Sequence, residues 1–239
     1  MDKIMNETYL DCLTSFGIGG AHPGGLQLTK KIVSNEKIEK SFSVLDAGCG
    51  TGQTSAYIAK RYKCNVTALD SNKVMLDKAR QRFTSLSLPI QTRLGNTEGL
   101  PFESGVFDIV LSESVIAFTT IPSTISELRR VLKPTGVLLA TEMVLEKSIP
   151  KEEEELLKEF YGISQLLSKE EWFLLFRNGG FNHVSAQDKF QLDESDIENA
   201  SDYILSDHID DKYLDILDEH NRLTNLYKNV LDFRVFRCC

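Results

Sequence analysis

The segment VLDAGCGTG at residues 44–52 constrains the fold more than any other part of the chain, because a short apolar run ends at Asp46 and is followed by Gly48, Gly50 and Gly52 on alternate positions. In an open α/β sheet, ligands bind beyond the carboxyl ends of the strands, and glycines there let the main chain approach a ligand closely. The segment therefore predicts a strand, a ligand-binding turn and a helix, in that order.

The turn differs from the common nucleotide-binding patterns. A dinucleotide fingerprint, G-x-G-x-x-G, needs a third glycine where this chain has Gln53. A phosphate-binding loop needs Gly-Lys followed by Ser or Thr, and the sequence contains no such tripeptide. The pattern therefore disfavours a NAD-dependent oxidoreductase and excludes an ordinary nucleotidase loop.

Short apolar runs alternate with amphipathic stretches over the next hundred residues. Strands that alternate with helices indicate parallel βαβ units with right-handed crossovers, and hence a doubly wound sheet. We expect strands at residues 43–48, 65–70, 89–96, 106–114 and 137–142, and helices at residues 53–63, 72–83 and 123–132.

The rhythm changes after Glu142. The pattern predicts a helix over 149–167, a second helix that begins with a capping box at Ser168 and Glu171, and a long acidic helical segment over 193–229. We expect two further strands, at residues 181–192 and 230–236, that pair antiparallel at one edge of the sheet.

Composition restricts the partners of the protein. The formal net charge is −8, and the acidic excess lies in residues 143–239, so nucleic acid and anionic membrane surfaces are poor candidates. No run of residues is apolar enough for a membrane span, and residues 1–13 lack the apolar core of a signal peptide. The five cysteines form no C-x-x-C pair, and we expect no metal site. These features predict a cytoplasmic monomer or homodimer.

An acid followed by G-x-G-x-G resembles motif I of the class I S-adenosylmethionine-dependent methyltransferases. The stretches TALDSN, GNTEGLPF, FDIVLSESV and ELRRVLKPTGVLLATE are similar to later motifs of that family, in the same order. The resemblance is strong over residues 43–142 and loose over 170–239. It implies a doubly wound, mostly parallel, seven-stranded Rossmann-like sheet with an antiparallel last strand and a helical N-terminal lid.

The resemblance also implies S-adenosylmethionine as the cofactor, and it assigns roles to particular residues. Asp46 would lie near the cationic end of the cofactor, Asp70 would accept bonds from both ribose hydroxyls, and Met75 would cover one face of the adenine. The amide oxygen of Asn96 would accept a hydrogen bond from the adenine amino group, because only the oxygen of the amide is an acceptor. The implied cofactor-binding set is Asp46, Gly48, Cys49, Gly50, Asp70, Ser71, Met75, Asn96, Thr97 and Ser112.

The expected acceptor is a small molecule, and the candidates for catalysis are His22, Glu113, Tyr9 and Glu142. Glu113 follows the fourth strand and Glu142 ends the fifth, so we expect both carboxylates to point into the crevice. Tyr9 and His22 belong to the glycine-rich N-terminal segment, which resembles the lid of small-molecule methyltransferases. Trp172 is another aromatic candidate for the acceptor side, although packing is the simpler interpretation.

The whole chain, residues 1–239, is expected to form one methyltransferase domain. Residues 1–42 would be the helical lid, residues 43–142 the cofactor-binding core, and residues 143–239 the remainder of the sheet with acidic helical insertions. Two alternatives stay open: a non-catalytic regulatory protein that binds S-adenosylmethionine, and a NAD-dependent oxidoreductase. The sequence does not identify the acceptor.

Overall fold

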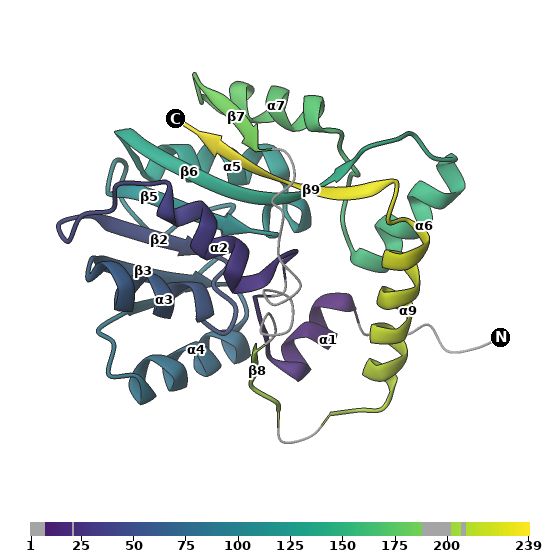
Figure 1. The fold of residues 1–239 in the computed structure, drawn as a ribbon, viewed down its shortest axis with the longest axis horizontal. Helices are drawn as coiled ribbons and strands as arrows, with labels where there is room; N and C mark the ends of the chain where they lie inside the picture. Colours follow the sequence, from purple (N-terminus) through teal and green to yellow (C-terminus); the bar gives the residue numbers. More distant parts are fainter. Residues whose placement is uncertain (1–7, 21, 188–201, 207–208) are drawn as a thin grey trace.

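The computed structural model describes residues 8–20, 22–187, 202–206 and 209–239. Its centre is a seven-stranded sheet with the strand order β4-β3-β2-β5-β6-β9-β7 (Figure 1). The five strands from β4 to β6 are parallel, whereas β9 is antiparallel to both β6 and β7. The strands are β2 (Ser43–Ala47), β3 (Asn65–Asp70), β4 (Gln91–Leu94), β5 (Phe107–Glu113), β6 (Leu132–Leu145), β7 (Val184–Gln187) and β9 (Leu231–Cys238). This arrangement confirms the predicted doubly wound sheet with its antiparallel last strand.

Helices cover both faces of the sheet and bury its apolar side chains. One face packs against α2 (Gly25–Ser34), α3 (Gln53–Tyr62) and α4 (Lys73–Ser85). The other face packs against α5 (Ile121–Val131) and α7 (Lys169–Asn178). Because both faces are covered, the central strands are apolar on both sides, as parallel sheets require.

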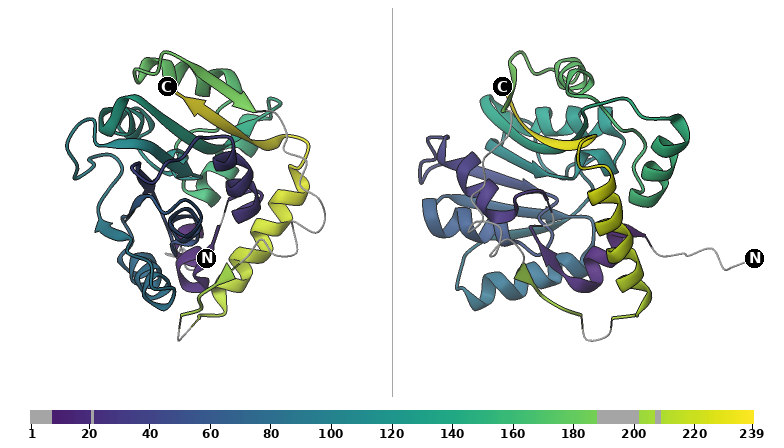
Figure 2. Two further views of the ribbon diagram at one scale, coloured as in Figure 1. Left: turned by 60° about the vertical axis from the view of Figure 1, so that its left-hand side comes forward. Right: turned by 45° about the vertical axis from the view of Figure 1, so that its right-hand side comes forward.

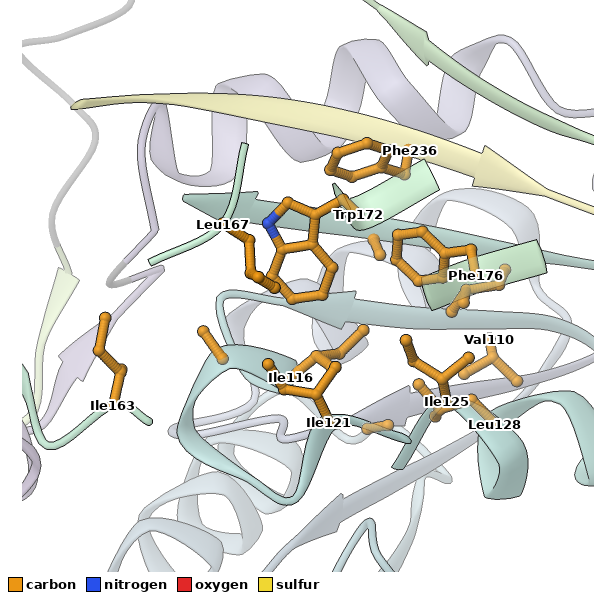
Figure 3. Close-up of a cluster of buried hydrophobic side chains, with 14 of the residues drawn as sticks. Val110, Ile116, Ile121, Ile125, Leu128, Ile163, Leu167, Trp172, Phe176 and Phe236 are labelled. Atoms are coloured by element: carbon orange, nitrogen blue, oxygen red, sulfur yellow. The ribbon is translucent and has the colours of Figure 1, made fainter. Parts of the chain in front are cut away.

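A cluster of large side chains fills the second face and includes Trp172. Its ring stacks on Phe176 and lies 6.1 Å from the ring of Phe236, measured between centroids (Figure 3). The indole Nε1 donates a hydrogen bond of 2.9 Å to the carbonyl oxygen of Met143. Trp172 is therefore a core residue with its one donor satisfied, and not part of an acceptor site.

Three further helices form a layer at the carboxyl side of the parallel strands. They are α1 (Tyr9–Phe16), α6 (Lys151–Tyr161) and α9 (Lys212–Leu226), and α1 lies against both of the others (Figures 1 and 2). The short strand β1 (Ile18–Gly19) pairs antiparallel with β8 (Asp202–Tyr203), which joins the N-terminal segment to the C-terminal part of the chain. Segments from both halves of the sequence thus meet at the carboxyl ends of the parallel strands.

Two predicted helices have different bounds in the structure. α6 ends at Tyr161 instead of residue 167, because Gly162 adopts a left-handed conformation with φ 72° that terminates the helix. The acidic helix begins at Lys212, since residues 202–203 form a strand, and residues 193–201 of that prediction lie outside the described residues. The capping box at Ser168 is confirmed.

Other predictions on the organisation of the chain are not tested by this fold. The strand expected at 181–192 begins only at Val184, as β7, and its predicted residues 188–192 lie outside the described part. No helix among the described residues is long and apolar enough to cross a membrane. The division into lid, core and C-terminal part stays a prediction.

Candidate active site

The glycine loop between β2 and α3 is tied to the end of β3. The backbone N–H groups of Gly48 and Cys49 both donate to the carbonyl oxygen of Leu69, at 2.8 and 2.9 Å. All three glycines of the loop have positive φ, at 89° for Gly48, 52° for Gly50 and 77° for Gly52. L-residues with side chains rarely adopt this conformation, so the alternate glycines are what allow the turn.

The three glycines differ in what surrounds them. A Cβ at Gly48 would lie 2.4 Å from Cγ2 of Val115, and a Cβ at Gly52 would lie 2.5 Å from the ring of Phe83. A Cβ at Gly50 would meet nothing closer than the Met75 methyl carbon, at 4.0 Å. Gly48 and Gly52 are therefore required by packing within the protein, whereas Gly50 faces the open side of the loop.

Asp70 lies at the end of β3, next to this open side. Its Oδ2 accepts the Gly50 N–H and its Oδ1 accepts the Asn72 N–H, both at 2.8 Å. Burial raises the pKa of the Asp70 carboxyl, and backbone N–H donors act in the opposite direction. Each carboxylate oxygen keeps a further lone pair, so Asp70 can also accept hydrogen bonds from a ligand's hydroxyl groups.

The other predicted cofactor residues differ in exposure. Asn96 is exposed, and its Oδ1 accepts the Glu98 N–H at 2.9 Å, which makes a local turn. Thr97 is buried, whereas Ser71 is exposed. Ser112 is fully buried, and its Oγ has no hydrogen-bond partner within the described structure. A buried hydroxyl without a partner is unusual and suits a position next to a ligand.

Asp46 at the end of β2 and Cys49 in the loop itself are both buried. Ser55 Oγ donates to Oδ2 of Asp46 at 2.6 Å. Burial raises the pKa of the Asp46 carboxyl to about 7, and the negative charges of Glu113 and Asp70 raise it further. Burial also raises the pKa of the Cys49 thiol. The bond from Ser55 to Asp46 therefore joins the first turn of α3 to the end of β2, on either side of the loop.

The structure brings the two candidates His22 and Glu113 together. Nε2 of His22 lies 3.5 Å from Oε2 of Glu113, and their side chains are only 4% and 8% exposed. Thr29 of α2 donates to Oε1 of Glu113 and Thr54 of α3 donates to Oε2, both at 2.7 Å. The site thus joins β5, α2, α3 and the N-terminal segment at the end of the sheet.

Sequence reasoning missed Thr29 and Thr54. Thr54 is the second residue of α3, just after the glycine loop. From this position its side chain can reach the end of the neighbouring strand β5. Nothing in the pattern of α2 marks Thr29, because its partner Glu113 is 84 residues away in the sequence. Only the packing of α2 against the sheet reveals this contact.

The expectation that Glu142 points into the same crevice as Glu113 is not met. Glu113 is paired with Thr141 across β5 and β6, and successive side chains of a strand point to opposite faces, so Glu142 leaves the sheet on the other face. Its Oε1 accepts the Val115 and Ile116 N–H groups at 3.3 and 2.9 Å, and its Oε2 accepts the Ala117 N–H at 3.3 Å. Burial raises its pKa to about 8.

Tyr9 also lies apart from the His22 and Glu113 pair. Its ring packs against Phe160 and Tyr161 of α6 and His220 of α9, with centroids 5.1 to 6.0 Å apart. Burial raises the pKa of its phenol well above the ordinary value, so the phenol stays protonated and no phenolate is available to act as a base. In the structure Tyr9 joins three helices through aromatic contacts.

The doubly wound sheet and the glycine loop after its first strand are typical of the class I methyltransferases. Residues 44–136 match the family described as a methyltransferase domain. The chain is 39% identical over 228 residues to an uncharacterized methyltransferase, YodH, of Bacillus subtilis (strain 168), and the match covers 95% of this chain and 97% of that protein. The chain therefore belongs to the class I S-adenosylmethionine-dependent methyltransferases.

More distant relatives share the fold. The chain is 26% identical over 210 residues to phosphoethanolamine N-methyltransferase 1 of Zea mays, and this match covers 84% of the chain but 42% of that protein. A crystal structure of phosphoethanolamine N-methyltransferase 2 of Haemonchus contortus with S-adenosyl-L-methionine has a TM-score of 0.76 at 17% identity, with 98% of this chain and 57% of that chain covered. The cyclase SpnF reaches a TM-score of 0.72 at 19% identity, over 89% of this chain and 80% of that chain. The fold by itself does not fix the reaction.

S-adenosylmethionine is the methyl donor of this family, and the residues of the loop fit it. Gly50 leaves its side of the turn open, Asp70 keeps lone pairs for hydroxyl donors, and Ser112 has a buried hydroxyl to satisfy. The acidic side chains Asp46 and Asp70 also suit a ligand that carries a sulfonium and an ammonium group.

Proposed function

We propose that this protein transfers the methyl group of S-adenosylmethionine to a small-molecule acceptor, and that His22 and Glu113 form the proton-accepting pair at the acceptor. The observation that carries the proposal is the buried contact of 3.5 Å between Nε2 of His22 and Oε2 of Glu113, at the carboxyl end of β5. Titratable side chains that meet in a ligand site are the usual candidates for proton transfer.

Bound S-adenosylmethionine supplies an already activated methyl group for in-line displacement by an oxygen, nitrogen, carbon or sulfur atom. The protein's own contribution is to align the acceptor and to exclude water. Where the acceptor atom carries a proton, His22 accepts it and Glu113 balances the positive charge of the imidazolium. Thr29 and Thr54 donate to both oxygens of Glu113 and so fix the position of that carboxylate.

A small acceptor is favoured because the N-terminal segment closes against the cofactor-binding core. Nζ of Lys78 donates to the carbonyl oxygen of Thr14 at 2.8 Å and to Oγ of Ser206 at 3.0 Å. Nδ2 of Asn72, whose backbone N–H binds Asp70, donates to Oγ1 of Thr14 at 3.0 Å. These bonds hold α1 and residues 204–206 beside the proposed ribose site, as expected of a lid. The related phosphoethanolamine methyltransferases are likewise named for a small molecule.

The experiment is to incubate the protein with methyl-labelled S-adenosylmethionine and a metabolite extract, and to follow the label by mass spectrometry. We expect the label in a low-molecular-weight product that requires the extract. His22→Asn and Glu113→Gln should reduce transfer by roughly 100-fold or more, the usual size of a general-base contribution, while S-adenosylhomocysteine still binds. His183→Asn, at an exposed histidine next to β7, is the matched control and should be fully active.

Two outcomes would contradict the proposal. Label in protein or RNA would show that the acceptor is a macromolecule. Tight binding of S-adenosylhomocysteine without any labelled product, over a wide range of extracts, would instead favour a regulatory protein that binds the cofactor without catalysis. The cytoplasmic location and the monomeric or homodimeric state stay predictions from the sequence.

A further inference from the structure

We propose that Glu142 is a positioning residue for the cofactor, which holds the backbone of residues 115–117 against the glycine loop and so keeps the methionine side of the cofactor site in shape. This inference rests on the binding of S-adenosylmethionine beside Gly50, as in the proposed function. Glu142 lies on the opposite face of the sheet from Glu113, so we do not assign it the role of a base. The inference gives this buried carboxyl group a different role.

The first step of the argument is the geometry at Glu142. After β5 the chain turns sharply at Ser114, which has φ 56°, and its N–H donates to the carbonyl oxygen of Thr141 at 2.7 Å. The next three N–H groups, of residues 115–117, all point at the Glu142 carboxylate. Ile116 and Ala117 are buried, so without this acceptor their N–H groups would lack partners, at a cost of about 1–3 kcal/mol each.

The second step links this backbone to the cofactor loop. The side chain of Val115 occupies the space beside Gly48 that a Cβ there would need, with Cγ2 2.4 Å from the ideal Cβ position. Gly48 in turn is two residues from Gly50, whose side of the loop is open. A displacement of residues 115–117 therefore removes the packing partner of Gly48, and the loop can then shift at Gly50, where we place the cofactor.

The third step concerns the partners of Glu142. The Glu142 side chain is fully buried, and no ion pair to it occurs among the residues that the structure describes. The partners of its two oxygens are the backbone N–H groups of residues 115–117, so the position of this side chain and the position of that backbone depend on each other. A change at Glu142 should therefore alter the geometry of residues 115–117 as well as the stability of the protein.

The test compares Glu142→Gln with Asp108→Asn. The amide of Gln keeps one acceptor oxygen but presents an NH2 group to the Ala117 N–H, whereas Asp108 is a carboxylate that accepts the Ser43 N–H at 2.8 Å near the opposite, amino end of β5. Titration calorimetry with S-adenosylhomocysteine should give a Kd about 5- to 50-fold weaker for Glu142→Gln, equivalent to about 1–2.3 kcal/mol. For Asp108→Asn the Kd should stay within about twofold of wild type, even if its melting temperature falls as much.

A double-mutant cycle with Val115→Ala checks the route of the effect. Val115→Ala alone should raise the Kd for S-adenosylhomocysteine. The Kd of the double variant should not exceed the larger of the two single-variant Kd values, because both changes remove the same contact with the loop. Full additivity, or a Kd within twofold of wild type in folded Glu142→Gln, would overturn the proposal. If Glu142→Gln does not fold, an unchanged Kd for Val115→Ala overturns it equally. Failure to methylate any small molecule would overturn the proposed function alone.

Discussion

The three glycines of the glycine loop, Gly48, Gly50 and Gly52, should respond differently to substitution by alanine. Each has positive φ, which costs an L-residue about 1–2 kcal/mol. At Gly50 nothing else opposes a Cβ, so Gly50→Ala should lose about that amount of stability and still fold. At Gly48 and Gly52 the new Cβ would also collide with Val115 or Phe83. Overpacking of this kind adds about 1–3 kcal/mol, for a total of about 2–5 kcal/mol.

Cofactor binding tests the open side of the loop at Gly50 directly. The Gly50 Cβ projects into the side of the loop where we place the methionine moiety, so Gly50→Ala should weaken S-adenosylhomocysteine at least tenfold, or about 1.4 kcal/mol, in a protein that remains folded. Urea unfolding measures the stabilities, and titration calorimetry measures the Kd. Gly105 has φ 70° and nothing within 4 Å of an added Cβ, so Gly105→Ala is the matched control for backbone strain alone.

Two results would refute this reasoning. If Gly50→Ala bound S-adenosylhomocysteine like wild type, the open side of the loop would not be the cofactor side. If Gly52→Ala were as stable as Gly50→Ala, the contact with Phe83 would not limit the loop. Either result could be separated from simple strain, because Gly105→Ala should lose about 1–2 kcal/mol without any change in Kd.

Three further outcomes are expected. Asp70→Ala should weaken S-adenosylhomocysteine by roughly tenfold to several hundredfold, since two charge-assisted bonds to the ribose would be lost, and an unchanged Kd in calorimetry would argue against that role. Burial raises the Asp46 pKa to about 7, above the unfolded value near 4, so its contribution to stability is lost as pH rises between these values. The melting temperature of wild type should therefore fall relative to that of Asp46→Asn between pH 5 and pH 8. A difference in melting temperature that stayed constant over this range would contradict this. Deletion of residues 1–21 should leave a folded protein with sharply reduced turnover if the segment is a lid, whereas full turnover with a normal melting temperature would exclude a lid.

The sequence alone determined the order of elements from β2 to β6 and the position of the glycine loop. These features depend on local rules: strands and helices have different apolar periods, and left-handed turns need glycine. Asp70 follows the loop by about the length of one βαβ unit, so its position beside Gly50 could also be predicted from the sequence. His22 and Glu113 could be named as candidates because a glycine-rich segment and a strand end are both recognisable locally.

Only the tertiary structure decided which of these candidates meet. Glu113 and Glu142 look alike in the sequence, because each stands at or near the end of an apolar strand, yet the register of β5 and β6 sends them to opposite faces of the sheet. Thr29 contacts Glu113 only because α2 packs against the sheet. Tyr9 packs against aromatic rings on α6 and α9 instead of contacting His22 or Glu113. These contacts join residues far apart in the chain, and their geometry depends on how whole elements pack, which no local pattern of residues encodes.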